Sequence, residues 1–84
     1  MLKLLYFASL RERMGRTEEE LALPAGIATI GDLITHLQSR DPKSHAAFAQ
    51  PSLVRAAVNQ EFAGRSAPIH DGDEIAFFPP VTGG

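Results

Sequence analysis

A single stretch of helical periodicity interrupts a sequence that otherwise alternates like β-strands, and it limits the folds open to the chain. Thr29 is a favourable N-cap residue, and Pro42 disfavours the helical conformation in Asp41, so the helix is expected between these limits. Its buried face consists of four apolar residues at the i, i+3, i+4 and i+7 positions, namely Ile30, Leu33, Ile34 and Leu37. One helix of this length covers only one face of one small sheet, which favours an α+β architecture.

Strand patterns lie on both sides of this helix. Five segments are predicted as strands, at residues 2–7, 18–23, 53–58, 61–63 and 74–78. The first and last strands are both long and apolar, which favours a central, parallel pairing between them. The order predicts an α+β fold of the β-grasp (ubiquitin-like) roll type. In this fold, residues 1–80 form a mixed five-stranded sheet with one main helix packed on one face.

The alternation within the strands separates a buried face from an exposed face. Lys3 marks the exposed face of the first strand, so Leu5 and Phe7 are expected to point away from the core. In the last strand, Phe77 is expected to point inward and Phe78 outward. Outward phenylalanines would expose apolar surface, and such surface is typical of a binding interface.

Shorter features complete the predicted fold. Ser9 and Glu12 have the spacing of a capping box, which predicts a short helix closed by Gly15. The three glutamates at 18–20 predict a solvated edge strand. Residues 42–52 are predicted as a connection with room for one helical turn.

Composition excludes several classes of function. A chain of 84 residues can bury one core but cannot enclose a deep pocket of its own. Its net charge is −2 and no basic block or long apolar stretch occurs, so no nucleic acid and no membrane is expected as a partner. We expect the chain to be cytoplasmic. It has no cysteine, and its acidic and histidine residues lack ligand spacing, so no metal site is predicted.

The carboxyl end has an unusual composition. Two prolines, Pro79 and Pro80, stop the last strand and favour an extended polyproline conformation. Residues 81–84 are predicted as a flexible Gly-Gly tail, in which Gly83 and Gly84 allow the backbone to enter a narrow site. The functional group would be the terminal carboxylate, which becomes an acyl donor only after conversion to a better electrophile.

Three segments together resemble a known family. They are residues 71–84, DGDEIAFFPPVTGG, residues 56–60, AAVNQ, and residues 3–11. They are similar to the MoaD family, the small sulfur-carrying subunits of molybdopterin synthase. The resemblance implies that an E1-like adenylyltransferase (MoeB-type) uses ATP to adenylate Gly84, which then becomes a thiocarboxylate. It implies no cofactor bound to this chain.

The resemblance also implies a partner and an interface. A large, MoaE-type subunit would receive the tail, in a heterotetramer of two small and two large subunits. Two thiocarboxylate sulfurs would then convert cyclic pyranopterin monophosphate into the dithiolene of molybdopterin. Such a chain is a subunit of a sulfurtransferase and not an autonomous enzyme. The residues implied to contact the large subunit, with the tail that follows them, are Phe7, Arg11, Phe62, Phe78, Pro79, Pro80, Val81 and Thr82.

Two other functions remain open from the sequence. A ubiquitin-like protein modifier would use the same terminal glycine to form isopeptide bonds with lysines. Within this chain only Lys3 and Lys43 could serve as acceptors for chains of the modifier. A thiamin-type sulfur carrier would share the fold and the terminus but deliver its sulfur to a different acceptor enzyme.

Overall fold

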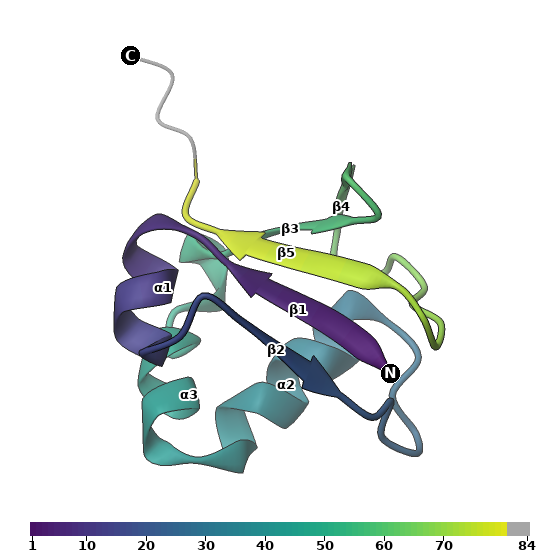
Figure 1. The fold of residues 1–84 in the computed structure, drawn as a ribbon, viewed down its shortest axis with the longest axis horizontal. Coiled ribbons are helices and arrows are strands. Elements are labelled where there is room, and N and C mark those ends of the chain that lie inside the picture. Colours follow the sequence, from purple (N-terminus) through teal and green to yellow (C-terminus); the bar gives the residue numbers. More distant parts are fainter. Residues whose placement is uncertain (81–84) are drawn as a thin grey trace.

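A mixed sheet with the strand order β2-β1-β5-β3-β4 carries the helices on one of its faces (Figure 1). The computed structural model describes residues 1–80, and the predicted tail at 81–84 lies outside the described residues. The elements follow one another as β1 (Leu2–Tyr6), α1 (Ala8–Met14), β2 (Glu18–Leu21), α2 (Ile30–Arg40), α3 (Pro42–Ala47), the 3-10 helix η1 (Pro51–Leu53), β3 (Arg55–Val58), β4 (Glu61–Ala63) and β5 (Glu74–Phe78). The predicted β-grasp fold is confirmed.

The first and last strands form the centre of the sheet. β1 and β5 are parallel, with Leu4 opposite Ile75 and Tyr6 opposite Phe77. Both strands alternate between buried and less buried residues, so their inward side chains face the helical layer and form much of the core. The parallel central pair predicted from the two ends of the chain is therefore confirmed.

Helix α2 packs its predicted apolar stripe against this sheet. All four residues of the stripe are buried. At its start, the Thr29 hydroxyl accepts the Asp32 N–H at 3.1 Å, and the Asp32 carboxylate accepts the Thr29 N–H at 3.2 Å. This reciprocal capping box satisfies two backbone donors that a helix start leaves free. No helix within residues 1–80 is long and apolar enough to cross a membrane.

The hairpin between β3 and β4 turns through two residues in the left-handed region. The φ angles of Asn59 and Gln60 are 50° and 72°, as a two-residue hairpin turn requires. The Asn59 side chain also bonds to β5, because its amide oxygen accepts the Glu74 N–H at 3.0 Å. The predicted turn is confirmed, and its side chain fixes the hairpin against the central strand.

The capping box predicted at Ser9 and Glu12 is wrong. Helix α1 begins two residues earlier, with Phe7 as the N-cap in place of Ser9 and no side-chain hydrogen bond at the cap. The N–H of Phe7 donates to the carbonyl oxygen of Phe77 at 3.1 Å, so strand pairing continues to the residue where the helix starts. The end at Gly15 is confirmed, with a left-handed φ of 73°.

The connection at 42–52 contains more structure than one turn. Helix α3 starts with Pro42 at its first position, and the Asp41 carboxylate caps it by accepting the Ser44 N–H at 2.8 Å. Phe48, at its end, is completely buried. Its ring meets Phe77 edge-on, with centroids 5.1 Å apart. The segment therefore supplies part of the core.

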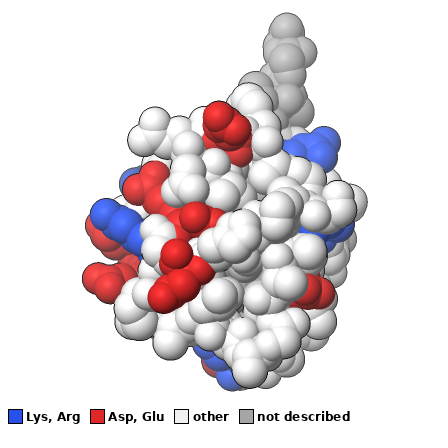
Figure 2. All heavy atoms as spheres, turned by 90° about the vertical axis from the view of Figure 1, so that its right-hand side faces the viewer, with Lys and Arg blue, Asp and Glu red and all other residues white. Residues whose placement is uncertain are grey.

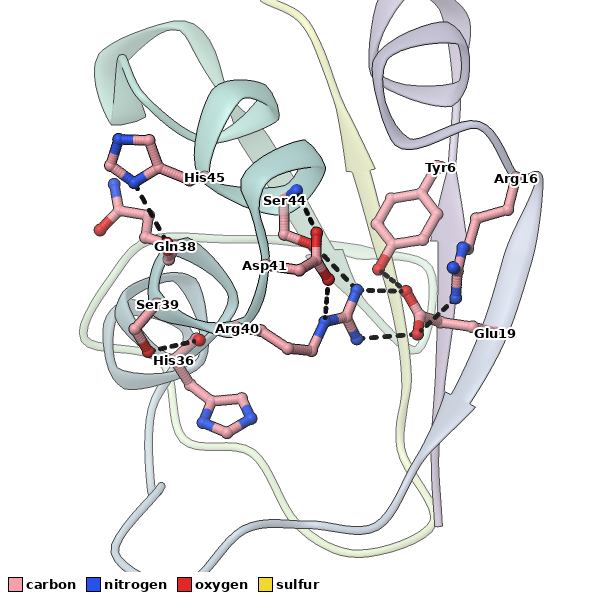
Figure 3. Close-up of polar contacts among 10 residues, drawn as sticks. All are labelled: Tyr6, Arg16, Glu19, His36, Gln38, Ser39, Arg40, Asp41, Ser44 and His45. Atoms are coloured by element: carbon pink, nitrogen blue, oxygen red, sulfur yellow. Dashed lines mark hydrogen bonds and ion pairs between the residues drawn. The ribbon is translucent and has the colours of Figure 1, made fainter.

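The solvated edge predicted for residues 18–20 is wrong at Glu19. Its side chain is only 11% exposed. Its carboxylate accepts hydrogen bonds from the Tyr6 hydroxyl at 2.7 Å and from the Arg40 guanidinium at 2.8 and 3.0 Å (Figure 3). Arg40 in turn donates to Ser44 and Asp41, at 2.9 and 3.1 Å. Glu19 thus ties the edge strand β2 to the ends of α2 and α3.

These contacts shift the protonation of the Glu19 carboxyl. Burial by itself raises its pKa, but the hydrogen bonds from Arg40 and Tyr6, with the nearby guanidinium charges, outweigh burial and lower the pKa below its ordinary value. Burial and then the Glu19 carboxylate raise the pKa of Tyr6, so the hydroxyl stays a donor at neutral pH. The Glu19 carboxyl is therefore ionised at neutral pH and paired with Arg40 in the folded chain.

We expect Glu19→Gln to lower the free energy of unfolding by about 1–3 kcal/mol at pH 7, because Arg40 loses a charged partner. A lowered pKa stabilises the fold above the unfolded pKa, and the stabilisation disappears as the pH falls through the folded pKa. The difference between the variant and the parent should therefore shrink in acid. Urea unfolding from pH 7 down to about pH 3 measures it. Glu20→Gln is the control, because Glu20 is exposed on the same strand. A difference that stays constant with pH would contradict the assignment.

Candidate functional site

The last described residues are packed against the helical layer. After β5 ends at Phe78, Pro79 and Pro80 are half-buried. They line a small hollow of about 150 Å³ together with residues of α1, α3, η1 and the segments that follow α3 and η1, namely Ser9, Leu10, Arg13, Ala47, Gln50, Leu53 and Val54. The two prolines that precede the tail therefore lie beside the helical layer. The predicted site residues Val81, Thr82, Gly83 and Gly84 lie outside the described residues.

An apolar band crosses the face of the sheet that the helices leave open. Leu5, Ala76, Ala57 and Phe62 are successive cross-strand neighbours from β1 to β4. Phe78 packs beside the end of this row, with its ring centroid 5.8 Å from that of Phe62. Phe62 is 85% exposed, which is exceptional for a phenylalanine in a globular domain. The band offers apolar surface to a partner next to the start of the tail.

The two adjacent phenylalanines of β5 point to opposite faces, as predicted. Phe77 is completely buried, and its ring stacks on Tyr6 with the centroids 6.2 Å apart. Phe78 is half-buried on the other face, against Phe62. The strand alternation therefore divides the pair into one core residue and one surface residue.

Phe7 and Arg11 lie at the end of the neighbouring strand. Phe7 is 47% exposed, directly after β1. Arg11 is exposed one helical turn later, and its N–H donates to the Phe7 carbonyl oxygen at 3.4 Å. Phe78 lies on the adjacent strand β5, and Phe62 lies on β4, two strands beyond β5. The structure thus places four of the eight predicted interface residues, Phe7, Arg11, Phe62 and Phe78, at the surface. Their contact with a partner stays a prediction.

The sequence analysis did not single out Arg55. It is exposed at the start of β3, directly opposite Phe78 in the β3–β5 ladder. With the aromatic pair it lines an open hollow of about 430 Å³, completed by Ala56, Ala63 and Gly64. The signal was present in the alternation of β3, because Val54 and Ala56 point inward and Arg55 must therefore point outward.

Charge is distributed unevenly over the two ends of the molecule. Arg11, Arg13 and Arg55 lie near the end of β5. Figure 2 looks onto the opposite end, where acidic side chains gather. The acidic residues at the start of β5, and beside it in the neighbouring strands, are Asp71, Asp73, Glu74, Glu20 and Glu61. Within residues 1–80, the structure brings together no group of three acidic or histidine side chains that could hold a metal ion.

Comparison with known proteins identifies the family. The pattern of the ThiS family matches residues 4–84, which is nearly the whole chain. The chain belongs to the ThiS family. One relative, the molybdopterin synthase sulfur carrier subunit of Escherichia coli, is 42% identical to this chain over 84 residues, which is 100% of both chains. The resemblance predicted from three segments of the sequence is confirmed.

Solved structures share the fold of this ThiS family member. The protein described as putative molybdopterin converting factor, subunit 1, from Pyrococcus furiosus is 32% identical. It superposes with a TM-score of 0.75 over 95% of this chain and 97% of its own. Small archaeal modifier protein 1 of Haloferax volcanii is 27% identical, with a TM-score of 0.73 over 95% of this chain and 97% of its own. The fold therefore occurs in both a converting-factor subunit and a modifier.

Proposed function

We propose that this chain is the sulfur carrier subunit of a molybdopterin synthase. The identity of 42% to the carrier subunit of Escherichia coli, over the full length of both chains, is the observation that carries the proposal. The geometry supports it, because apolar surface and the start of the tail lie at the same end of β5. A carrier needs this arrangement, since one contact surface must hold the partner while the tail enters it.

The proposed chemistry begins at the carboxylate of Gly84. In an E1-like adenylyltransferase of the MoeB type, a carboxylate oxygen attacks the α-phosphate of ATP and pyrophosphate leaves. A sulfur nucleophile then attacks the acyl carbon and AMP leaves, so the terminus becomes a thiocarboxylate. Gly83 carries no side chain that would obstruct the approach. The carrier itself needs no bound cofactor for these steps, and we place them in the cytoplasm.

Delivery takes place in a large, MoaE-type subunit. Each carrier supplies one sulfur, and the dithiolene made from cyclic pyranopterin monophosphate needs two. A heterotetramer of two small and two large subunits meets this requirement. The apolar band and Phe7 dock on the large subunit while residues 81–84 reach its reacting centre. The half-buried Pro79 and Pro80 limit the directions in which the tail can leave the sheet, which reduces the entropy lost on insertion.

Protein modification is the second candidate function. Its support is the structural likeness to small archaeal modifier protein 1 of Haloferax volcanii. The same activated terminus would then react with a lysine amine instead of a sulfur donor. The full-length relatives named as molybdopterin synthase sulfur carrier subunits favour sulfur transfer. The two functions can be separated by mass, because a sulfur carrier gains sulfur whereas a modifier becomes linked to another protein.

Intact mass spectrometry of the chain purified from its own cells tests the proposal. We expect a population heavier than the encoded chain by the difference between one sulfur and one oxygen atom. Incubation with the large subunit and the pterin substrate should return this population to the encoded mass. A population linked to other proteins through isopeptide bonds, with none carrying sulfur, would overturn the proposal in favour of a modifier.

A further inference from the structure

Three arginines from two different elements lie near the end of β5. Arg13, on α1, lines the hollow that holds Pro79 and Pro80. Arg55, on β3, lies opposite Phe78 and lines the hollow beside the aromatic pair. Arg11 follows Phe7, whose N–H bonds to the end of β5. We call Arg11, Arg13 and Arg55 the arginine collar.

The collar has no partner for its charge within residues 1–80. All three side chains are exposed, and none forms an ion pair with the described acidic residues, including Glu12 between two of them on α1. Three of the other five lysines and arginines are paired with glutamates, as Lys3 is with Glu18 at 3.6 Å and Arg40 with Glu19 at 2.8 Å, whereas Lys43 and Arg65 form no ion pair within residues 1–80. The positive charge at the collar is therefore free to act on another molecule.

This free charge has a consequence for any surface that receives the tail. Docking on the apolar band brings the collar to the rim of the interface. Arginines at such a rim lose hydration, and carboxylates on the facing surface compensate for the loss. The collar is too small and the chain too acidic overall, at a net charge of −2, for binding to a polyanion such as nucleic acid.

We propose that the arginine collar docks on a ring of carboxylates around the mouth of the pocket in which the large synthase subunit receives the tail. The inference rests on the proposed function and adds the chemistry of the partner surface. The ring of carboxylates would repel the acidic opposite end of the carrier. The electrostatic field between the two proteins therefore turns the tail end of the carrier toward the pocket before contact. Salt should therefore slow association more than it speeds dissociation.

Charge reversal at one collar residue, compared with the same reversal elsewhere on the same face of the sheet, tests the inference. The test uses the full chain and the large subunit of the same organism, with association and dissociation rates measured by stopped-flow fluorescence at low and high salt. Arg55→Glu is expected to reduce the association rate at least about tenfold at low salt, and less at high salt. Arg13→Glu should act in the same direction.

Lys3→Glu is the matched control. Lys3 is exposed on the same face of the sheet at its acidic end, and the change in charge is identical. It should leave the association rate within about twofold of the parent. Thermal melts of each variant show whether the fold is intact. Equal effects of Arg55→Glu and Lys3→Glu would overturn the inference and leave the proposed function standing. Absence of binding by the parent chain would overturn both.

Discussion

A chain that ends at Gly83 is expected to take up no sulfur, while it melts at the same temperature as the parent. The proposed reacting group is the terminal carboxylate, and removal of one residue draws it back by about 3.3–3.6 Å of extended chain. Misplacement of a reacting group by about 1 Å already costs on the order of 100-fold in rate. Stability should not change, because the buried core lies between Leu2 and Phe77. Mass spectra after incubation with the activating enzyme, ATP and a sulfur donor measure the loading.

A chain extended by one serine beyond Gly84 is the complementary variant. It keeps both glycines but converts the Gly84 carboxylate into an amide, which cannot attack ATP. We expect neither adenylate nor thiocarboxylate on it, again with an unchanged melting temperature. Sulfur on the extended chain, without removal of the added serine, would show that the carboxylate of Gly84 is not required as the carrier group.

Substitution of the two adjacent phenylalanines should separate stability from binding. Phe77→Ala is expected to lower the free energy of unfolding by about 3–5 kcal/mol, because the buried ring leaves a cavity between Tyr6 and Phe48. Phe78→Ala should cost less than half of that. It should instead weaken binding of the large subunit by roughly 1–4 kcal/mol, as loss of an interface anchor does. Urea unfolding and titration calorimetry measure the two effects.

A loss of about 3–5 kcal/mol is a large share of the stability of a domain of this size. Phe77→Leu therefore serves as a milder variant that keeps most of the buried volume. Phe62→Ala is expected to weaken binding as well, with little loss of stability, because Phe62 belongs to the apolar band and is 85% exposed. Equal destabilisation by Phe77→Ala and Phe78→Ala would contradict the assignment of the two rings to opposite faces.

The sheet and the main helix were predictable because each carries a periodic signal. The stripe of α2, the alternation of β1 and β5 and the turn at Asn59 each follow from local chemistry. The start of α1 was predicted wrongly because Phe7 is held by a hydrogen bond to the distant Phe77, which overrides the local capping signal. The burial of Phe48 also depends on a distant contact, and residues 42–52 carry no periodicity that would indicate it.

The candidate site was predictable to a similar extent. The exposure of Phe7 and Phe78 followed from strand parity and agrees with the structure. Arg55 was missed because its position gains meaning only when β3 pairs with β5 and brings it opposite Phe78. The charge of Glu19 indicated solvent, yet its carboxylate bonds to Tyr6 and Arg40, which are 13 and 21 residues away in the sequence. The roles of Arg55 and Glu19 were both missed because they depend on contacts between residues far apart in the sequence.

The position of β5 between β1 and β3 determines how the domain responds to mechanical force. A protein that grips the tail and pulls applies its load along β5, through Pro79 and Pro80. Because β5 is hydrogen-bonded on both sides, its ladders are loaded in shear and their bonds must break together, whereas an edge strand could be peeled away bond by bond. Forced unfolding is governed by the rate of crossing that barrier. The domain is therefore built to stay folded under a pull on its carboxyl end, which the proposed insertion of the tail into a partner would apply.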